Sequence, residues 1–114
     1  VVMGEWGGLC PKKTDWFSHI DFVYSLIEQN QWSSIYWNYY FENDEFVRLM
    51  NRPYPIAVCG DIISYRTDSN ERKFFMEYKV SDDYVLAETQ IYVPNKGVQK
   101  FKSNYGINKI EISY

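Results

Sequence analysis

The sequence has little of several features that would each point to a class of protein. Its 114 residues include one histidine and two cysteines, so neither a zinc site nor a disulfide framework is indicated. Lysine and arginine number 12 against 15 aspartate and glutamate residues, and the absence of a basic cluster argues against a nucleic-acid partner. The chain has no run of about 18 apolar residues, so the sequence indicates no membrane-spanning helix. We expect no metal and no cofactor.

The two cysteines leave the compartment open. Cys10 and Cys59 fall in segments that we assign to different domains, so two unpaired thiols are expected. The opening Val1-Val2-Met3-Gly4-Glu5 already lies in a strand pattern, without an initiator methionine or a signal peptide. We therefore expect that a preceding stretch of chain is missing, and the absence of a targeting segment carries little weight.

Aromatic residues are plentiful, at 19% of the chain with 11 Tyr, 7 Phe and 4 Trp. This surplus has two interpretations. Aromatic side chains favour strands and strand cores. They also suit surfaces that face sugars, where a flat ring meets the apolar face of a pyranose.

The first part of the chain predicts strand, helix, strand. Residues 1–6 form an apolar run that ends at Gly7-Gly8. Thr14 or Asp15 is a suitable N-cap for a helix that ends near Asn30. Its expected buried stripe repeats every three or four residues: Phe17, Ile20, Val23, Tyr24 and Ile27. An aromatic strand over 32–40 follows, so this part resembles one unit of a parallel α/β protein whose remaining sheet is absent.

A domain boundary is predicted at Arg52-Pro53-Tyr54-Pro55. Residues 42–50 before it form a short helix or an irregular excursion. The two prolines hold the backbone extended and remove N–H donors. We therefore divide the chain into an incomplete domain at 1–52 and a second domain at 53–114.

The second domain shows the two-residue period of strands. An all-β sandwich is predicted, because several short strands alternate with turn sequences at regular intervals. The expected strands are 56–58, 61–65, 73–80, 85–93, 98–102 and 107–114.

Glu5 is the strongest candidate for chemistry. It lies at the carboxyl end of the first strand, where parallel α/β barrels place their active-site residues, and flanking glycines allow close approach of a substrate. A carboxylate there can attack an anomeric carbon or bind a metal; alternatively it is an ordinary solvated strand-end residue. Trp37 ends the next strand on the same edge, either as a floor beneath a sugar ring or as a core residue.

The remaining candidates are better explained by structure. His19 lies within the predicted helix, where a solvated or packed role outweighs catalysis. Trp32, Tyr39 and Tyr40 are assigned to packing, and Lys12-Lys13 to a solvated surface.

Two segments resemble glycoside hydrolase family 5. Met3-Gly4-Glu5-Trp6-Gly7 is similar to the segment around the nucleophile on barrel strand seven of that family. Ser34-Ile35-Tyr36-Trp37-Asn38-Tyr39 resembles strand eight, whose tryptophan lines a sugar subsite. The helix between them fits barrel helix seven.

The second domain resembles the endoglycoceramidase-like branch of the same family. Residues 52–60, Arg-Pro-Tyr-Pro-Ile-Ala-Val-Cys-Gly, are similar to the join between barrel and C-terminal β-domain, and residues 88–94 to a strand of that domain. Cys59 departs from the small residue expected there and fits sterically.

The resemblance implies the end of a (β/α)8 barrel followed by a β-sandwich. It implies a retaining β-glycosidase, in which Glu5 is the nucleophile and Trp37 binds the sugar. The acid/base residue of the family has no match in this chain, so the chain alone is expected to be inactive.

The resemblance also implies a substrate and a setting. The expected substrate is a glycan–ceramide, glucosylceramide-type glycolipid or oligosaccharide, with the missing N-terminal barrel as partner and a secreted or lysosome-like location. The aromatic-rich strands of the β-sandwich separately suggest contact with a membrane surface that holds a lipid-embedded substrate. The alternative is a non-catalytic carbohydrate- or lipid-binding β-sandwich.

Overall fold

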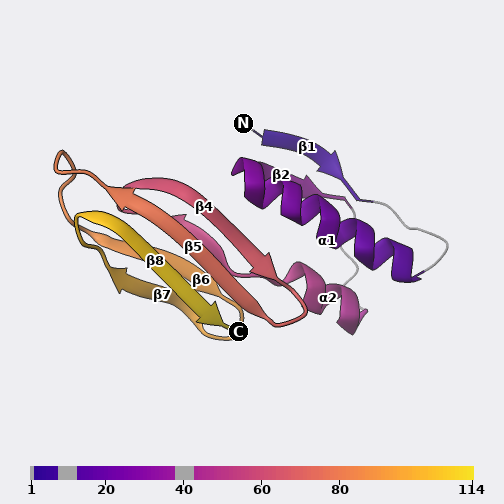
Figure 1. The fold of residues 1–114 in the computed structure, drawn as a ribbon. Coiled ribbons are helices and arrows are strands. Elements are labelled where there is room, and N and C mark those ends of the chain that lie inside the picture. The colour runs from indigo at the N-terminus through magenta and orange to yellow at the C-terminus, as the bar shows by residue number, and fades with distance from the viewer. Residues whose placement is uncertain (1, 8–12, 38–42) are drawn as a thin grey trace. The chain divides into compact units, whose positions relative to one another are not determined.

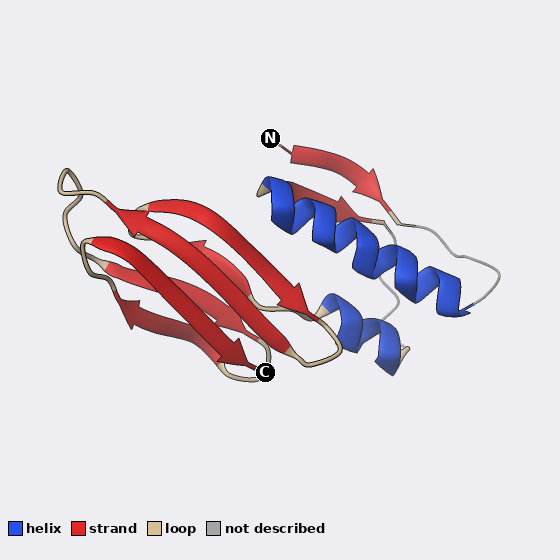
Figure 2. Cartoon of the chain, in the orientation of Figure 1, coloured by secondary structure: helices blue, strands red, loops and turns tan. Residues whose placement is uncertain are grey.

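The computed structural model describes residues 2–7, 13–37 and 43–114, and the chain divides into two compact units, Val1–Asn51 and Arg52–Tyr114. Figures 1 and 2 show helices and strands in the first unit and strands throughout the second. Each unit has its own cluster of buried apolar side chains.

The first unit is built on a pair of parallel strands. Strand β1 spans Val2–Trp6, helix α1 spans Lys13–Asn30, and strand β2, which spans Ser33–Tyr36, pairs with β1 in parallel. The predicted strand-helix-strand order is therefore present. Residues 38–42, including Tyr39 and Tyr40, lie outside the described residues.

Helix α1 buries the predicted apolar stripe. Ile20, Val23 and Ile27 are buried, Phe17 and Tyr24 pack at the edge of the cluster, and Trp16 joins them. The helix begins at Lys13, before the predicted N-cap. Asp15 therefore lies in the first turn, where a carboxylate stabilises the positive end of the helix dipole.

Residues 44–50 form helix α2, which resolves the two alternatives left open by the sequence. Helix α2 spans Asp44–Met50, and the side chain of Asn43 accepts a hydrogen bond from the Phe46 N–H at 2.9 Å. This N-cap satisfies one of the free donors at the start of the helix. Phe46 is fully buried and stacks on Trp16.

The second unit is a sandwich of two three-stranded antiparallel sheets. One sheet has the order β3-β6-β7 and the other β4-β5-β8. The strand bounds are β3 Tyr54–Ala57, β4 Asp61–Asp68, β5 Lys73–Val80, β6 Glu88–Val93, β7 Gly97–Lys102 and β8 Gly106–Ser113. The predicted all-β domain is confirmed.

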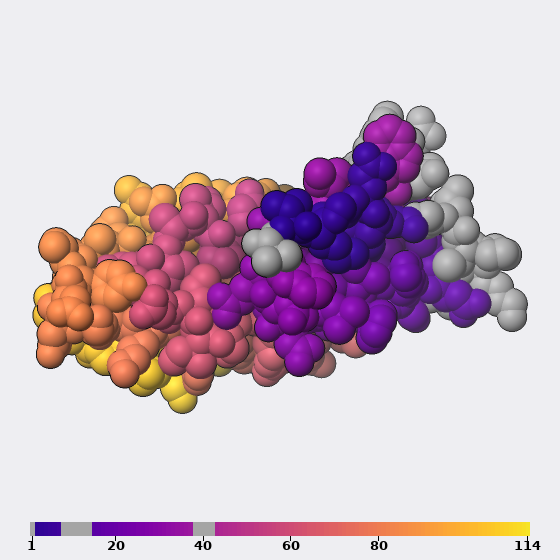
Figure 3. All heavy atoms as spheres, turned by 90° about the horizontal axis from the view of Figure 1, so that it is seen from above, coloured from indigo at the N-terminus to yellow at the C-terminus, as the bar shows by residue number. Residues whose placement is uncertain are grey.

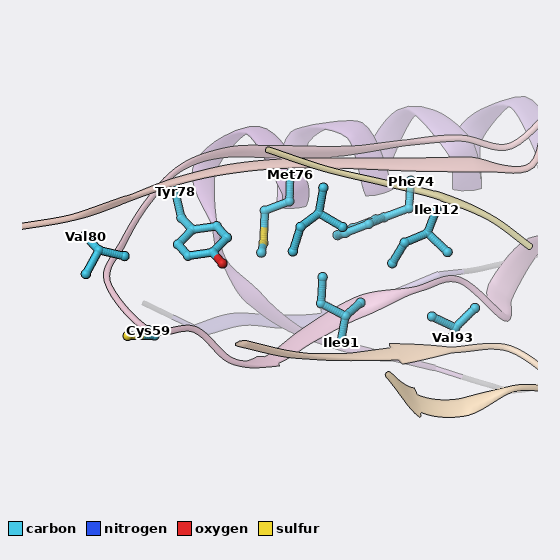
Figure 4. Close-up of a cluster of buried hydrophobic side chains, with 9 residues drawn as sticks. Cys59, Phe74, Met76, Tyr78, Val80, Ile91, Val93 and Ile112 are labelled. Carbon is cyan, nitrogen blue, oxygen red and sulfur yellow. The ribbon is translucent and has the colours of Figure 1, made fainter. Parts of the chain in front are cut away.

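The core of the sandwich is filled from both sheets, as Figure 4 shows. Strand β5 contributes Phe74, Met76 and Tyr78, and strand β6 contributes Ile91 and Val93. Alternate residues of each strand point into the core, as expected from the two-residue period of strands.

Three buried hydroxyl groups, those of Tyr78, Thr89 and Ser103, lie close together in this core. Ser103 Oγ lies 3.0 Å from Tyr78 Oη and 3.3 Å from Thr89 Oγ1, and Thr89 Oγ1 also accepts a hydrogen bond from the Cys59 N–H at 3.0 Å. Each of these three hydroxyl groups therefore has a partner, which makes its burial tolerable.

Three strands of the sandwich differ from the predicted bounds by two residues or more at one end. Strand β3 includes Pro55, which is tolerated because β3 is an edge strand. Strand β4 extends to Asp68, three residues beyond the predicted end at Tyr65. Strand β6 begins at Glu88 and not at Val85, because its partner β7 ends at Lys102, opposite Glu88.

Candidate active site

The two predicted site residues come together at one edge of the first unit. Strands β1 and β2 are parallel, with Glu5 opposite Ile35 and Trp6 opposite Tyr36. One residue further, the Trp37 N–H donates to the Trp6 carbonyl at 2.8 Å. Parallel strands end at the same edge of a sheet, so Glu5 and Trp37 both lie at the carboxyl edge.

Both residues lie on the face of the strand pair that points away from α1. Trp6 belongs to the buried cluster beside α1, which we call the helix-side cluster, and Tyr36 packs against it. The cluster comprises Trp6, Trp16, Ile20, Val23, Ile27 and Phe46. Glu5 and Ile35 alternate with them and are exposed, and Trp37 is 65% exposed. Because successive strand residues point to opposite faces, Glu5, Ile35 and Trp37 share the open face.

An irregularity at Gly4 sets the direction of Glu5. The strand register shifts between Met3 and Glu5. Without the shift, Met3 and Glu5 would share a face; with it, Met3 packs against the helix-side cluster while Glu5 is exposed. Bulges of this kind re-aim side chains next to active sites. The sequence signal for it was a glycine inside an otherwise apolar strand.

Gly7 holds the two strand ends close together. Its φ angle is +138°, and a Cβ atom at this position would overlap the backbone carbonyl oxygen of Trp37. Only glycine accommodates both this backbone conformation and this approach. The distance between the Glu5 and Trp37 segments therefore depends on a residue without a side chain.

Aromatic side chains pack beneath this edge and support it. The ring of Trp6 makes edge-to-face contacts with Tyr24, at 5.3 Å between centroids, and with Tyr36, at 4.8 Å. The Trp16 indole donates a hydrogen bond to the Tyr36 hydroxyl at 3.2 Å. Such aromatic pairs add stability beyond the area that they bury, and they fix the residue next to Glu5.

The other candidates stay outside this edge. His19 is an exposed residue of α1, and Trp32 packs beside the helix-side cluster. The described part of the chain contains no cluster of three or more potential metal ligands, and none of its helices is long and apolar enough to cross a membrane. Cys59 is a buried free thiol, whereas Cys10 and Lys12 lie outside the described residues.

The arrangement places a carboxylate beside an indole at one strand edge. An exposed carboxylate at a strand end can act as a nucleophile or as a general base, and an adjacent exposed indole offers an apolar surface.

The sequence of the second unit shows which family the chain belongs to. The profile of the glycoside hydrolase family 5 C-terminal domain matches residues 52–112.

The chain belongs to this family.

Solved structures similar to this family 5 chain include two of Cryptococcus neoformans sterylglucosidase 1. The structure with tris has a TM-score of 0.67 and 14% identity, covering 84% of this chain and 23% of the other. The structure with hit 1 has a TM-score of 0.65 and 12% identity, covering 86% and 24%. The family 5 chain thus spans about a quarter of their length. No curated protein sequence matches it significantly.

Two features of this edge of the family 5 chain were not evident from the sequence. The register shift at Gly4 and the contact of Gly7 with the Trp37 backbone both depend on how two strands pair across a helix. The glycines themselves were visible, but their partners are about 30 residues away along the chain.

Proposed function

We propose that this chain supplies the nucleophile and a sugar-binding tryptophan to a retaining β-glycosidase of glycoside hydrolase family 5. Glu5 would be the nucleophile, and Trp37 would stack beneath the sugar next to the cleaved bond. The observation that carries the proposal is the shared position of the two side chains, on the open face at the carboxyl edge of β1 and β2.

The first unit is proposed as the last strand-helix-strand of a (β/α)8 barrel, with residues 1–52 in the barrel and 53–114 in the β-sandwich. In such a barrel, helices cover the outside and active-site residues lie at the carboxyl ends of the strands. The parallel pairing of β1 and β2 supports this. The similarity to sterylglucosidase 1 covers 84% of the chain, so it extends into residues 1–51.

The proposed reaction proceeds in two displacements. A Glu5 carboxylate oxygen attacks the anomeric carbon, the glycosidic C–O bond breaks, and a second carboxylic acid protonates the leaving oxygen. That second residue then removes a proton from water, which attacks the anomeric carbon and releases Glu5. The acid/base residue is proposed to lie outside this chain, so residues 1–114 alone should show no turnover.

The proposed substrate is a glycolipid with a β-linked sugar on an apolar aglycone. The resemblance favours a ceramide aglycone, and the name of the similar structures favours a sterol. Both share a hydrophobic leaving group, which is the feature that we propose. A secreted or lysosome-like location agrees with such a substrate.

A carbohydrate-binding role for the sandwich is the second candidate. On the outer face of the β3-β6-β7 sheet, Tyr54 is exposed and stacks on Tyr92, with ring centroids 5.1 Å apart. Loss of glycan binding on Tyr54→Ala, with turnover unchanged, would favour this role.

The nucleophile is tested in the glycosidase that contains this chain. Glu5→Gln should lower kcat by several orders of magnitude on a fluorescent glucosylceramide or steryl glucoside while substrate binding is retained. Glu71→Gln, at an exposed turn of the sandwich, is the matched control and should leave turnover unchanged.

Azide distinguishes a nucleophile from an acid/base residue. In Glu5→Gly, azide should take the place of the carboxylate and yield a glycosyl azide with inverted anomeric configuration. A retained configuration would assign Glu5 to proton transfer, and near-normal turnover of Glu5→Gln would remove it from the chemistry.

A further inference from the structure

An apolar protrusion lies at one end of the β-sandwich. The loop of residues 81–87 joins β5 to β6, and Val85 at its tip is 88% exposed, the highest value among the large apolar side chains of the described residues. Tyr84 and Leu86 beside it and Tyr105 in the β7–β8 turn are also exposed. We name these four residues the loop patch. This loop lies at the orange end of the second unit in Figure 3.

Hydrogen bonds from other parts of the sandwich hold the loop in shape. Cys59 Sγ donates to the Val85 carbonyl at 3.5 Å and accepts from the Ala87 N–H at 3.2 Å. Tyr105 Oη donates to the Tyr84 carbonyl at 3.2 Å. The backbone is thus fixed while the side chains of Val85 and Leu86 remain in solvent, so displaying them carries little further entropic cost.

The two tyrosines of the loop patch present both an apolar ring and a polar end. Tyr84 Oη donates a hydrogen bond to Asp61 at 2.8 Å, and this bond raises the pKa of the Tyr84 phenol. Tyrosines with one apolar and one hydrated end are typical of the boundary between water and hydrocarbon. Tyr84 directly precedes the aliphatic tip of Val85 and Leu86, and Tyr105 bonds to the Tyr84 carbonyl.

The negative charge of residues 81–87 argues against an anionic partner surface. Asp82 and Asp83 are exposed and precede the tip, and no lysine or arginine occurs in residues 81–87. A surface rich in anionic lipids would repel these carboxylates. Contact through this loop therefore depends on apolar burial and suits a surface without net charge.

The outer face of the β4-β5-β8 sheet provides a contrast. Lys73 pairs with Glu111 at 3.4 Å and Lys109 with Glu77 at 3.1 Å, and the Arg66 guanidinium lies over the Phe75 ring. Charged side chains and their ion pairs thus occupy much of that face, although Ile107 is also exposed there. The apolar character of the sandwich surface is therefore not uniform, and the loop patch differs by being purely aliphatic at its tip.

We propose that the loop patch inserts Val85 and Leu86 into a lipid surface with zwitterionic or uncharged headgroups, with Tyr84 and Tyr105 at headgroup level. This inference rests on the proposed function, in which the substrate has an apolar aglycone and is embedded in such a surface. The loop would keep the enzyme at the membrane where the substrate lies.

The test measures vesicle binding of the intact protein without any substrate. Co-sedimentation with phosphatidylcholine vesicles is compared for wild type, Val85→Ser/Leu86→Ser, and the control Ile63→Ser/Val98→Ser, whose residues are each 48% exposed elsewhere on the sandwich. The loop variant should bind at least about tenfold more weakly, from the lost burial of two aliphatic side chains. The control should bind like wild type.

Salt and lipid charge test the basis of binding. Binding to phosphatidylcholine should be unchanged between low and high salt, and phosphatidylserine should weaken it. A thermal melt of each variant shows whether the fold is kept. If the double variant unfolds, Leu86→Trp replaces it, and its fluorescence should be quenched by brominated phosphatidylcholine more strongly than that of Ile63→Trp.

Several results would overturn the proposal: no binding of wild type to phosphatidylcholine, equal losses in the loop and control variants, or a preference for phosphatidylserine. Self-association that disappears in the loop variant, without vesicle binding, would assign the patch to an interface between copies. None of these readouts involves Glu5, so failure of the proposed catalytic role leaves this test intact.

Discussion

Gly60 and Gly97 both have a backbone conformation that favours glycine, but they differ in the space available for a side chain. Both have positive φ angles, but a Cβ atom at Gly60 would overlap the Lys79 carbonyl oxygen, whereas a Cβ atom at Gly97 would meet nothing within 4 Å. Gly97→Ala should destabilise the sandwich by about 1–2 kcal/mol through its backbone conformation. Gly60→Ala should lose roughly 1–3 kcal/mol more through the overlap.

Chemical denaturation of both glycine variants provides the measurement. Equal losses for Gly60→Ala and Gly97→Ala would contradict the close approach between Gly60 and strand β5.

Thr89 is the central hydroxyl of the buried polar network. Its Oγ1 accepts from the Cys59 N–H and lies 3.3 Å from Ser103 Oγ. Thr89→Val keeps the shape of the side chain but leaves the buried Cys59 N–H without an acceptor, which should reduce the free energy of unfolding by about 1–3 kcal/mol. Thr89→Ser keeps the hydroxyl and serves as the control. A smaller loss for Val than for Ser would mean that the methyl group matters more than the hydrogen bond.

At the level of elements, sequence patterns predicted the strands that are buried on one face and missed features that depend on a partner strand. Strand β5 has the predicted bounds, because every second residue, Phe74, Met76, Tyr78 and Val80, is apolar and buried over its whole length. Val85 was also predicted to lie in a strand, but none of the described strands pairs with it, and the side chains of Cys59 and Tyr105 bond its loop instead. Propensity alone cannot report such long-range contacts.

The candidate site was predicted to the same extent. The positions of Glu5 and Trp37 at two strand ends followed from the order strand, helix, strand. The orientation of Glu5 did not, because the register shift at Gly4 arises from pairing with β2. The role of Glu5 remains a prediction.

The two faces of strand β5 should differ strongly in their effect on stability. Met76 is fully buried, so Met76→Ala should lower the free energy of unfolding by about 2–5 kcal/mol. Glu77 points outward and pairs with the exposed Lys109, so Glu77→Gln should change it by less than about 1 kcal/mol. Denaturant melts at two salt concentrations provide the comparison. A large, salt-sensitive loss for Glu77→Gln would indicate that the outer ion pairs stabilise the sheet.

At the scale of the whole molecule, the two apolar clusters divide the chain. Every residue of the sandwich cluster lies in 52–114, and every residue of the helix-side cluster lies in 1–51. The first unit pairs just two described strands, and their face away from α1 exposes Val2, Ile35 and Trp37. Exposed apolar surface of this kind requires a partner or favours aggregation.

Separate expression of the two units tests this division. Residues 52–114 should fold alone, with β-type circular dichroism and one cooperative melt, because both faces of their core are closed by sheets. Residues 1–51 should lack a cooperative melt or should aggregate, because a two-stranded parallel sheet covered on one face buries too little apolar surface to offset the entropy of ordering the chain. A soluble 1–51 segment with a sharp melt would show that α1 and α2 suffice to stabilise the strand pair, and the open face around Glu5 would then need no neighbouring strands to exist.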